Sequence, residues 1–434
     1  MRIGYCSPFT PVRSGVSNFS EELVFALQKH IDIVLFSEVP LENPAITEHF
    51  EVHTLSELDN VSLRQSLDLI VYHVGNNATD HAKIIEMLQK YPGVIELHDV
   101  GLHHLAAEDA DRTQNWERYV ELAEYCHGNR GKRIALDYLA GKTGAPWEEH
   151  PLDMCMNRHI LDHGLAIIVH SDMAKQMVLA NNPAVPVGLI PYHSILCQEP
   201  LGSLAADCRQ KLQLSQNKLI FGSFGFASSD KRIPQILLAL KRFKQTYGSN
   251  FLYYIVGATV ESLQLDETLQ ELDLEDQVVV TGYVSHEDFY TYMGACDFCL
   301  NLRDPTYGGT SGCLHRMLGM GKPVIVTDIG SFMEYPDDIV RKVRCDEHEV
   351  DDIYETMLAL SNERKKLSLL AQQVYQYARE HYSLEINALR YKEFFEQVLN
   401  HAWQPDWTDL LVDRLMELGL TDAEYTAHLS KFLL

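Results

Sequence analysis

The sequence lacks the long hydrophobic runs that mark membrane and secreted proteins. No apolar run approaches the roughly 20 residues that a membrane-spanning helix needs. The opening segment, Met1 to Cys6, is also too short an apolar stretch for a signal peptide. We therefore expect a cytoplasmic protein without a transmembrane segment, and only a transient association with a membrane is compatible with this pattern.

Basic residues are scarce. The chain has 36 Lys and Arg against 61 Asp and Glu, which gives a formal net charge of −25. Such a field repels polyanions, so nucleic acid is excluded as a partner. An anionic nucleotide ligand stays compatible, because a few backbone N–H groups and one or two nearby cations can dominate at short range.

Cysteine frameworks and clusters of metal ligands are also missing. The nine cysteines have no even spacing, as expected of a reduced intracellular protein. Cys296 and Cys299 form a lone CxxC inside an apolar run, where cysteine acts as a small apolar residue. His159 and His163 are spaced to share one helical face, but no third ligand is evident. We predict no metal site and no cofactor.

The apolar runs alternate with stretches of helical periodicity. The chain of 434 residues is too long for one ordinary core, and its hydrophobic content of 46% favours two compact domains. In the first, a short strand, a loop from Ser7 to Gly15 and a helix from about Asn18 open a βα series. Further strands are expected at 31–36, 67–73, 94–97, 166–170 and 188–191, and then at 219–224, 251–257, 278–281, 297–302 and 324–327. The fold class is therefore α/β, with two Rossmann-like, doubly wound domains.

Composition shifts set the domain boundaries. Residues 1–196 form the first domain, with a helical insertion at about 103–159, and the polar segment 197–217 is the expected linker. Residues 218–381 form the second domain, and residues 382–434 form C-terminal helices, the first of which should pack back on the first domain. Open α/β sheets bind ligands at the carboxyl ends of their strands, so we expect the ligand in a central cleft between the domains.

A first anion-binding turn is predicted after the strand at 219–224. Phe224 and Gly225 end this strand, and Lys231 and Arg232 stand where the next helix begins. Glycine allows close backbone approach, while the cation and the helix N-terminus can address the same anion. The alternative is that Lys231 and Arg232 are solvated residues of the first helical turn.

A second turn of this kind follows the strand at 297–302. It contains glycines at 308, 309 and 312, and Thr310 and Ser311 offer hydroxyls and backbone donors at a helix N-terminus. Two such turns in one domain favour a diphosphate ligand. The Lys-Ser pair of a phosphate-loop NTPase is missing, and the first strand lacks the GxGxxG of a dinucleotide oxidoreductase.

These residues resemble the retaining GT-B glycosyltransferases, closest to glycosyltransferase family 4 (glycosyl transferases group 1). The matching segments are Phe224-Gly225 with Lys231, residues 278–285, Asp297 before its strand, and residues 321–330 with Glu334; in the first half they are Ser14 to Asn18 and His98-Asp99. Together they cover most of residues 1 to about 400.

The resemblance implies a metal-independent transfer of a hexose, with retention, from a UDP- or GDP-linked donor to a glycan or glycolipid in polysaccharide or glycoconjugate biosynthesis. The first domain would hold the acceptor and the second the nucleotide sugar. His98 and Lys231 would be catalytic. The expected donor-binding residues are Gly15, Phe224, Gly225, Lys231, Arg232, Tyr283, Val284, Gly309, Thr310, Ser311, Gly312 and Glu334.

The chain departs from the family pattern at three positions. The two family glutamates, which in relatives contact the donor sugar and the ribose, fall on Gly308 and Arg316 in one register and on Gly309 and Met317 in the other. Phe226 replaces the arginine that usually precedes the phosphate lysine. A non-catalytic nucleotide-sugar-binding or scaffold protein is therefore one alternative, and a sugar-nucleotide epimerase is another. His98 could also be an ordinary loop histidine, and Glu334 could merely cap the following turn.

Overall fold

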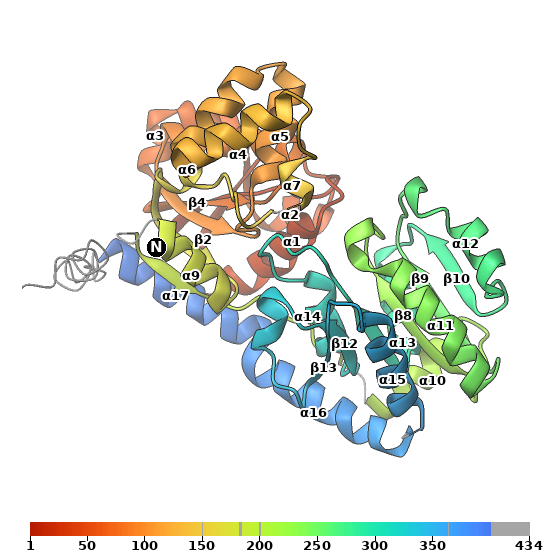
Figure 1. Cartoon of the computed structure of the whole chain (residues 1–434). Helices are drawn as coiled ribbons and strands as arrows, with labels where there is room; N and C mark the ends of the chain where they lie inside the picture. The colour runs from red at the N-terminus through yellow and green to blue at the C-terminus, as the bar shows by residue number, and fades with distance from the viewer. Residues whose placement is uncertain (150, 182–184, 199–200, 363, 401–434) are drawn as a thin grey trace, which may run out of the picture.

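The chain forms two α/β domains (Figure 1). It passes from one domain to the other twice, and the second passage lies within a long C-terminal helical segment. This computed structural model describes residues 1–149, 151–181, 185–198, 201–362 and 364–400. Each domain is built on one parallel sheet, which confirms the predicted pair of Rossmann-like domains.

The N-terminal domain contains a seven-stranded sheet in the order β3-β2-β1-β4-β5-β6-β7. Its strands are β1 (Arg2–Cys6), β2 (Asp32–Ser37), β3 (Glu51–Thr54), β4 (Leu69–Val74), β5 (Gly93–Leu97), β6 (Gly164–Val169) and β7 (Val187–Leu189). Its helices are α1 (Gly15–Leu27), α2 (Pro44–His49), α3 (Val61–Gln65), α4 (Ala78–Lys90), α5 (His103–Thr113), α6 (Trp116–Leu139), α7 (Pro146–Glu149), α8 (Arg158–Leu161) and α9 (Asp172–Asn181), with a 3₁₀ turn η1 (Leu55–Asp59). Helices α5 to α8 span most of the segment from 103 to 161.

The C-terminal domain contains a six-stranded sheet in the order β10-β9-β8-β11-β12-β13. Its strands are β8 (Leu219–Phe224), β9 (Phe251–Val256), β10 (Val278–Gly282), β11 (Phe298–Asn301), β12 (Val324–Thr327) and β13 (Val340–Val343). Its helices are α10 (Leu201–Lys211), α11 (Ile233–Tyr247), α12 (Leu265–Leu272), α13 (His286–Ala295), α14 (Gly312–Gly319), α15 (Glu349–Asn362) and α16 (Arg364–Tyr382), with 3₁₀ turns η2 (Ser229–Lys231), η3 (Glu261–Leu263) and η4 (Gly330–Glu334).

The last described helix, α17 (Leu384–Leu399), returns to the N-terminal domain. Figure 1 shows α16 along the C-terminal domain and α17 along the N-terminal domain. The α17 residues Tyr391, Phe394 and Phe395 lie in the same core cluster as residues of α1 and β1. Asn387 also donates a hydrogen bond to the Pro191 carbonyl at 2.6 Å. The N-terminal core is therefore completed by residues near the end of the described chain.

The segment 197–217 differs from the expected linker. It contains α10, whose Leu204 and Cys208 lie in the core of the C-terminal domain. The polar composition was misleading because only one face of α10 is buried, so its exposed face dominates the sequence pattern. The first crossing is instead the short stretch from Ile190 to Leu196.

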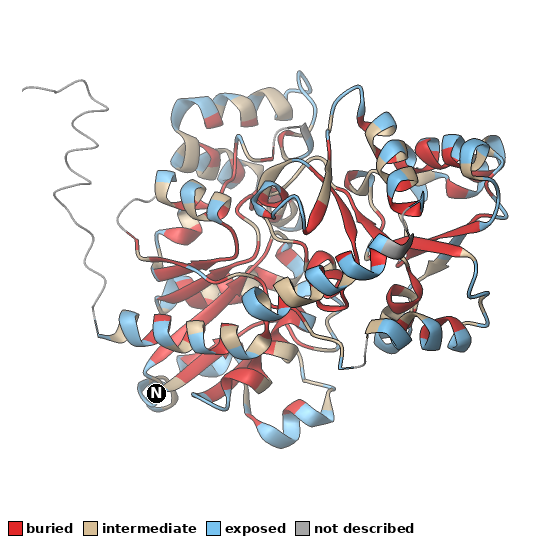
Figure 2. Cartoon of the chain, turned by 90° about the horizontal axis from the view of Figure 1, so that it is seen from below, coloured by how far each residue is buried: buried red, intermediate tan, exposed pale blue. Residues whose placement is uncertain are grey.

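Two edge strands were not predicted from the sequence. Strand β3 is short and half-polar, and β13 carries Arg341 and Lys342 between its two buried valines. Edge strands are exposed along one side, so they need no continuous apolar run. The central strands are buried on both faces, as Figure 2 shows, and these strands were predicted correctly from the sequence.

Among the described helices, none is long and apolar enough to cross a membrane.

Candidate active site at the domain interface

The first predicted turn follows the end of β8. Phe224 is buried, and Gly225 adopts a φ of +93°, which favours glycine. A β-carbon on Gly225 would lie 3.0 Å from the Cys313 sulfur in the first turn of α14. The absence of a side chain at Gly225 thus lets the first turn approach the start of α14.

Lys231 is the last residue of η2 and lines a small pocket together with Gly225 and Asn301. Its ammonium makes no hydrogen bond or ion pair with any described residue. Burial, with a contribution from the nearby Arg303 guanidinium, lowers the pKa of Lys231 to about 8. The lysine is therefore a partly desolvated cation without an anionic partner, which is the state that a phosphate ligand would stabilise.

The second turn ends at the N-terminus of α14. The Ser311 hydroxyl caps this helix by accepting from the Leu314 N–H at 3.3 Å, and it donates to the Asn301 amide oxygen at 3.0 Å. The first-turn amides of Gly312 and Cys313 find no acceptor among the described residues. The structure thus brings Gly225, Lys231 and the start of α14 together on one side of the domain, where Gly309, Thr310 and Ser311 also lie.

Arg232 does not join this group. Its guanidinium forms a two-pronged ion pair with the buried Glu349 of α15, and Nη1 lies 3.4 Å from an Asp304 carboxylate oxygen. With φ at +57°, the backbone of Arg232 turns the chain into α11. Its charge is thus already paired with two carboxylates, and the donor contact expected from Arg232 stays a prediction.

Glu334 also has a different contact from the one expected. Its two carboxylate oxygens accept from the backbone N–H groups of Asp172 and Met173, at 2.9 and 2.8 Å. Glu334 therefore caps the N-terminus of α9 in the other domain, rather than the turn that follows it or a donor. Sequence reasoning had left a capping role open but could not identify the helix, which lies about 160 residues earlier.

The predicted base-contact turn lies at the end of β10. Gly282 has a φ of +66°, Tyr283 is exposed and Val284 packs partly against the core. The guanidinium of Arg13, in the loop before α1, stacks over the Tyr283 ring at 4.8 Å. Gly15, the first residue of α1, follows two positions later; it is exposed, and a β-carbon there would meet open space. The two domains therefore meet at this turn too.

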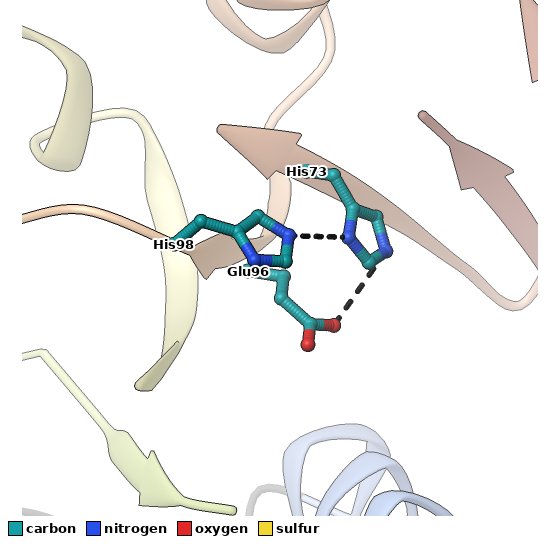
Figure 3. A group of neighbouring side chains, drawn as sticks. All are labelled: His73, Glu96 and His98. Atoms are coloured by element: carbon teal, nitrogen blue, oxygen red, sulfur yellow. Dashed lines mark hydrogen bonds and ion pairs between the residues drawn. The ribbon is translucent and has the colours of Figure 1, made fainter. Parts of the chain in front are cut away.

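His98 lies at the carboxyl end of β5 within a buried group of polar side chains (Figure 3). His73 Nδ1 is 3.0 Å from His98 Nε2, and His73 Nε2 is 3.5 Å from a Glu96 oxygen. The other Glu96 oxygen lies 3.6 Å from His170 Nε2 and accepts a hydrogen bond from Tyr391 of α17. His98 Nδ1 finds no hydrogen-bond partner among the described residues, so this nitrogen remains available to a ligand.

Burial sets the charge state of this group. It raises the pKa of Glu96 to about 8, and it holds the pKa of His98 well below its usual value, helped by the imidazoles of His170 and His73. At neutral pH, His98 is therefore an uncharged imidazole that can donate or accept one hydrogen bond at each nitrogen.

The same residues are the group best placed to hold a metal among the described ones. Ligand atoms of His73, Glu96 and His98 lie within 4.8 Å of one another. The 3.0 Å contact between the two imidazoles, however, is a hydrogen bond, so one of the two facing nitrogens carries a proton and is not a metal ligand. The geometry favours a hydrogen-bonded chain that holds the ring of His98 in place.

Sequence reasoning missed two polar side chains at the interface. Arg303 follows β11; its Nη1 lies 3.4 Å from an Asp230 oxygen, and its buried Nε has no hydrogen-bond partner among the described residues. Its charge acts on both Lys231 and Asp99. Asp99 follows His98 and faces the second turn from the opposite domain. The position of Arg303 at the carboxyl end of a strand was the available signal for this second cation.

Arg316 of α14 is a further interface residue. It stands at one of the positions where relatives carry a glutamate, and it pairs with Glu22 of α1. Glu22 also accepts a hydrogen bond from His193 at 2.8 Å, in the first crossing. A carboxylate is thus present beside this position, but it comes from the other domain.

The two facing parallel-sheet domains, with glycine-containing turns at the carboxyl ends of their strands, define the GT-B fold. Residues 206–381 match the family of glycosyl transferases group 1. The C-terminal domain thus carries the pattern of that family, and the resemblance seen in the sequence is confirmed. No curated protein matches the sequence significantly.

Solved structures with the same fold cover nearly the whole chain. HepE from Anabaena, in complex with UDP-glucose, is 15% identical with a TM-score of 0.63 over 92% of this chain and 100% of its own. Sucrose-phosphate synthase from Thermosynechococcus elongatus is 15% identical with a TM-score of 0.62 over the same shares. A glycosyltransferase from Rickettsia africae is 13% identical with a TM-score of 0.62 over 92% of this chain and 98% of its own. At these identities the likeness establishes the fold.

Proposed function

We propose that the protein is a glycosyltransferase that moves a hexose from a nucleotide diphosphate sugar to a glycan or glycolipid acceptor, with retention and without an obligatory metal. The observation that carries this proposal is the ammonium of Lys231, without a partner among the described residues, near the Gly312 and Cys313 amides at the start of α14, which also lack an acceptor there. Together they form an anion site at the carboxyl ends of β8 and β11, where nucleotide ligands of open α/β sheets bind.

Lys231 and α14 would bind the diphosphate and stabilise it as the leaving group. Charge accumulates on the diphosphate oxygens when the sugar departs, so contacts that strengthen at that moment lower the barrier. Each charge-assisted hydrogen bond of this kind contributes about 1.5–3 kcal/mol. Arg303 adds a second cation within electrostatic reach, which offsets the loss of the family arginine at Phe226.

The choice of donor rests on the similar structures. HepE has been solved with UDP and with UDP-glucose, which favours a UDP-linked hexose over a GDP-linked one for this chain. His98, an uncharged imidazole with one free nitrogen, would contact the donor sugar or the acceptor from the N-terminal domain. The product would enter a polysaccharide or glycoconjugate.

The test is a thermal-shift screen with UDP, GDP and ADP and their hexoses, followed by measurement of nucleoside diphosphate release with glycan acceptors. A ligand at about a hundred times its Kd adds about 2.7 kcal/mol to the stability. Lys231→Ala should abolish the shift and the release, whereas Lys241→Ala, at an exposed position of α11, should change neither. Binding without release would support the non-catalytic scaffold, and conversion of the donor without acceptor would support the epimerase. No shift with any nucleotide would refute the proposal.

A further inference from the structure

The loop 305–312 of the C-terminal domain meets the segment 98–101 of the N-terminal domain closely. The Gly101 N–H donates to the Tyr307 carbonyl at 2.9 Å. A β-carbon on Gly308 would lie 3.1 Å from the β-carbon of Val100. Glycines at 101 and 308 therefore allow two loops, about 200 residues apart in the sequence, to lie against each other.

The tightest approach is between Gly309 and Asp99. A β-carbon on Gly309 would lie 2.2 Å from Asp99 Oδ1 and 2.8 Å from the His98 carbonyl oxygen. The Asp99 carboxylate thus occupies the space that any side chain at position 309 would fill. The loop itself, with the sequence Pro-Thr-Tyr-Gly-Gly-Thr-Ser-Gly, has no acidic residue, so Asp99 supplies the carboxylate at this place.

One carboxylate oxygen of Asp99 accepts a hydrogen bond from the described residues, and the other does not. Oδ2 accepts from the Asn76 N–H at 3.3 Å. Oδ1, which faces Gly309, has no hydrogen-bond donor among the described residues. A half-buried carboxylate oxygen that no donor of the described residues reaches can accept a hydrogen bond from a ligand hydroxyl or amide.

The free oxygen lies next to the anion site. Gly309 is three residues before Gly312, whose amide opens α14, and the Ser331 hydroxyl donates to the Gly309 carbonyl at 3.2 Å. Arg303 acts electrostatically on both Asp99 and Lys231, so the carboxylate and the ammonium both lie near this cation. A hexose attached to a diphosphate at Lys231 would extend from the second turn towards Asp99.

We propose that Asp99 binds a hydroxyl group of the donor hexose, so that the N-terminal domain contributes a sugar-recognising carboxylate to a donor held by the C-terminal domain. This inference rests on the proposed function. Carboxylates accept strong hydrogen bonds from hydroxyl groups, and a second domain that supplies one couples sugar recognition to domain closure. The nucleotide part of the donor makes no contact with Asp99.

The experiment compares Asp99→Asn with the wild type for UDP and for a UDP-hexose that the wild type uses. We expect UDP affinity to change less than twofold, while kcat/KM for the UDP-hexose falls about ten- to a hundredfold, the loss of one charge-assisted hydrogen bond. The second arm uses a panel of monodeoxy UDP-hexoses. Removal of one particular hydroxyl should lower kcat/KM strongly for the wild type and only slightly for Asp99→Asn, because this variant already lacks the carboxylate that accepts from that hydroxyl.

The outcomes separate this inference from the proposed function. If the wild type binds no nucleotide sugar, the proposed function fails. The Asp99 assignment is overturned if the wild type is active but Asp99→Asn lowers the affinity for UDP as much as kcat/KM for the UDP-hexose. It is also overturned if, at every deoxy position, the loss of kcat/KM is additive with that of Asp99→Asn. Circular dichroism and the thermal midpoint verify that the variant is folded. If it is not, Asp99→Glu goes through the same panel, and a hydroxyl preference identical to that of the wild type counts against the assignment.

Discussion

Arg316 of α14 and Glu22 of α1 form a salt bridge between the two domains, with Arg316 Nη2 2.6 Å from Glu22 Oε1. Both side chains are largely buried, and the Arg316 charge lowers the pKa of Glu22 against the opposing effect of burial. This contact fixes α1 against α14, the helix whose N-terminus belongs to the proposed anion site.

Removal of one partner should destabilise the protein strongly. Arg316→Met removes the charged partner of the buried Glu22 but keeps its hydrogen bond with His193, and such a loss typically costs about 3–5 kcal/mol. Urea denaturation at pH 7 measures the change. The double variant Glu22→Gln with Arg316→Met should recover part of the loss, because no charge is left uncompensated. A double variant that is as unstable as the sum of the two single ones would contradict this account.

Diphosphate binding should weaken as the pH rises through about 8. In the free protein the pKa of Lys231 is lowered to about 8, so the ammonium that attracts the phosphates is lost above that pH. Isothermal titration of UDP between pH 6.5 and 9.5 measures the dependence. Lys231→Arg keeps its charge over this range and should give a much flatter profile. Equal slopes for both proteins would show that another group controls binding.

Glu96 should destabilise the fold at alkaline pH. Its folded-state pKa of about 8 exceeds the usual 4.5, so its contribution to stability is complete below about pH 4.5 and is lost as the pH rises through 8. Glu96→Gln mimics the protonated acid, and near pH 9 its free energy of unfolding should exceed that of the wild type by about 1–3 kcal/mol. Thermal unfolding at pH 6 and pH 9 tests this. Wild type and variant with parallel pH profiles would argue against a buried neutral Glu96.

Gly309→Ala should reduce donor use, because the new methyl group meets Asp99 Oδ1 and the His98 carbonyl oxygen. We expect kcat/KM for the UDP-hexose to fall at least tenfold, with a stability loss of about 1–3 kcal/mol from overpacking. Gly202→Ala in α10 is the matched control, since no atom lies within 4 Å of the added group. A harmless Gly309→Ala would mean that the two loops separate in solution.

Chelation should leave the activity unchanged. The 3.0 Å hydrogen bond between His73 and His98 leaves one of the facing nitrogens protonated, so we expect no bound metal in the group around Glu96. The measurements are nucleoside diphosphate release after dialysis against EDTA and metal analysis of the purified protein. Stoichiometric zinc, or activity restored only by a divalent ion, would overturn the metal-independent mechanism.

The elements that sequence patterns revealed are those whose signal is local. The central strands have continuous apolar runs, and the two turns proposed to bind an anion have glycines and polar residues next to a helix start. The start of α1 was placed too late, at about Asn18, since Ser14 caps the helix by accepting from the Ser17 N–H. The reason is that a loop glycine at position 15 forms the first helical residue.

The contacts that decide the site are mostly long-range. Asp99 meets Gly309, Arg316 meets Glu22, and Glu334 caps α9, each across the domain interface. Such pairs have no fixed spacing in the sequence, so neither periodicity nor a local motif can predict them. The ion pair of Arg232 was not foreseen for the same reason, because its partner Glu349 lies 117 residues further along.

The return of α17 to the first domain also constrains how the protein is made. On the ribosome, residues 1–196 emerge long before Tyr391 and Phe394, which fill part of their core and complete the hydrogen bonding of Glu96. The first domain must therefore stay incompletely packed until the residues of α17 have been synthesised. Chain termination before residue 384 would release a protein with an exposed apolar groove along α1, a ready target for chaperones and proteases.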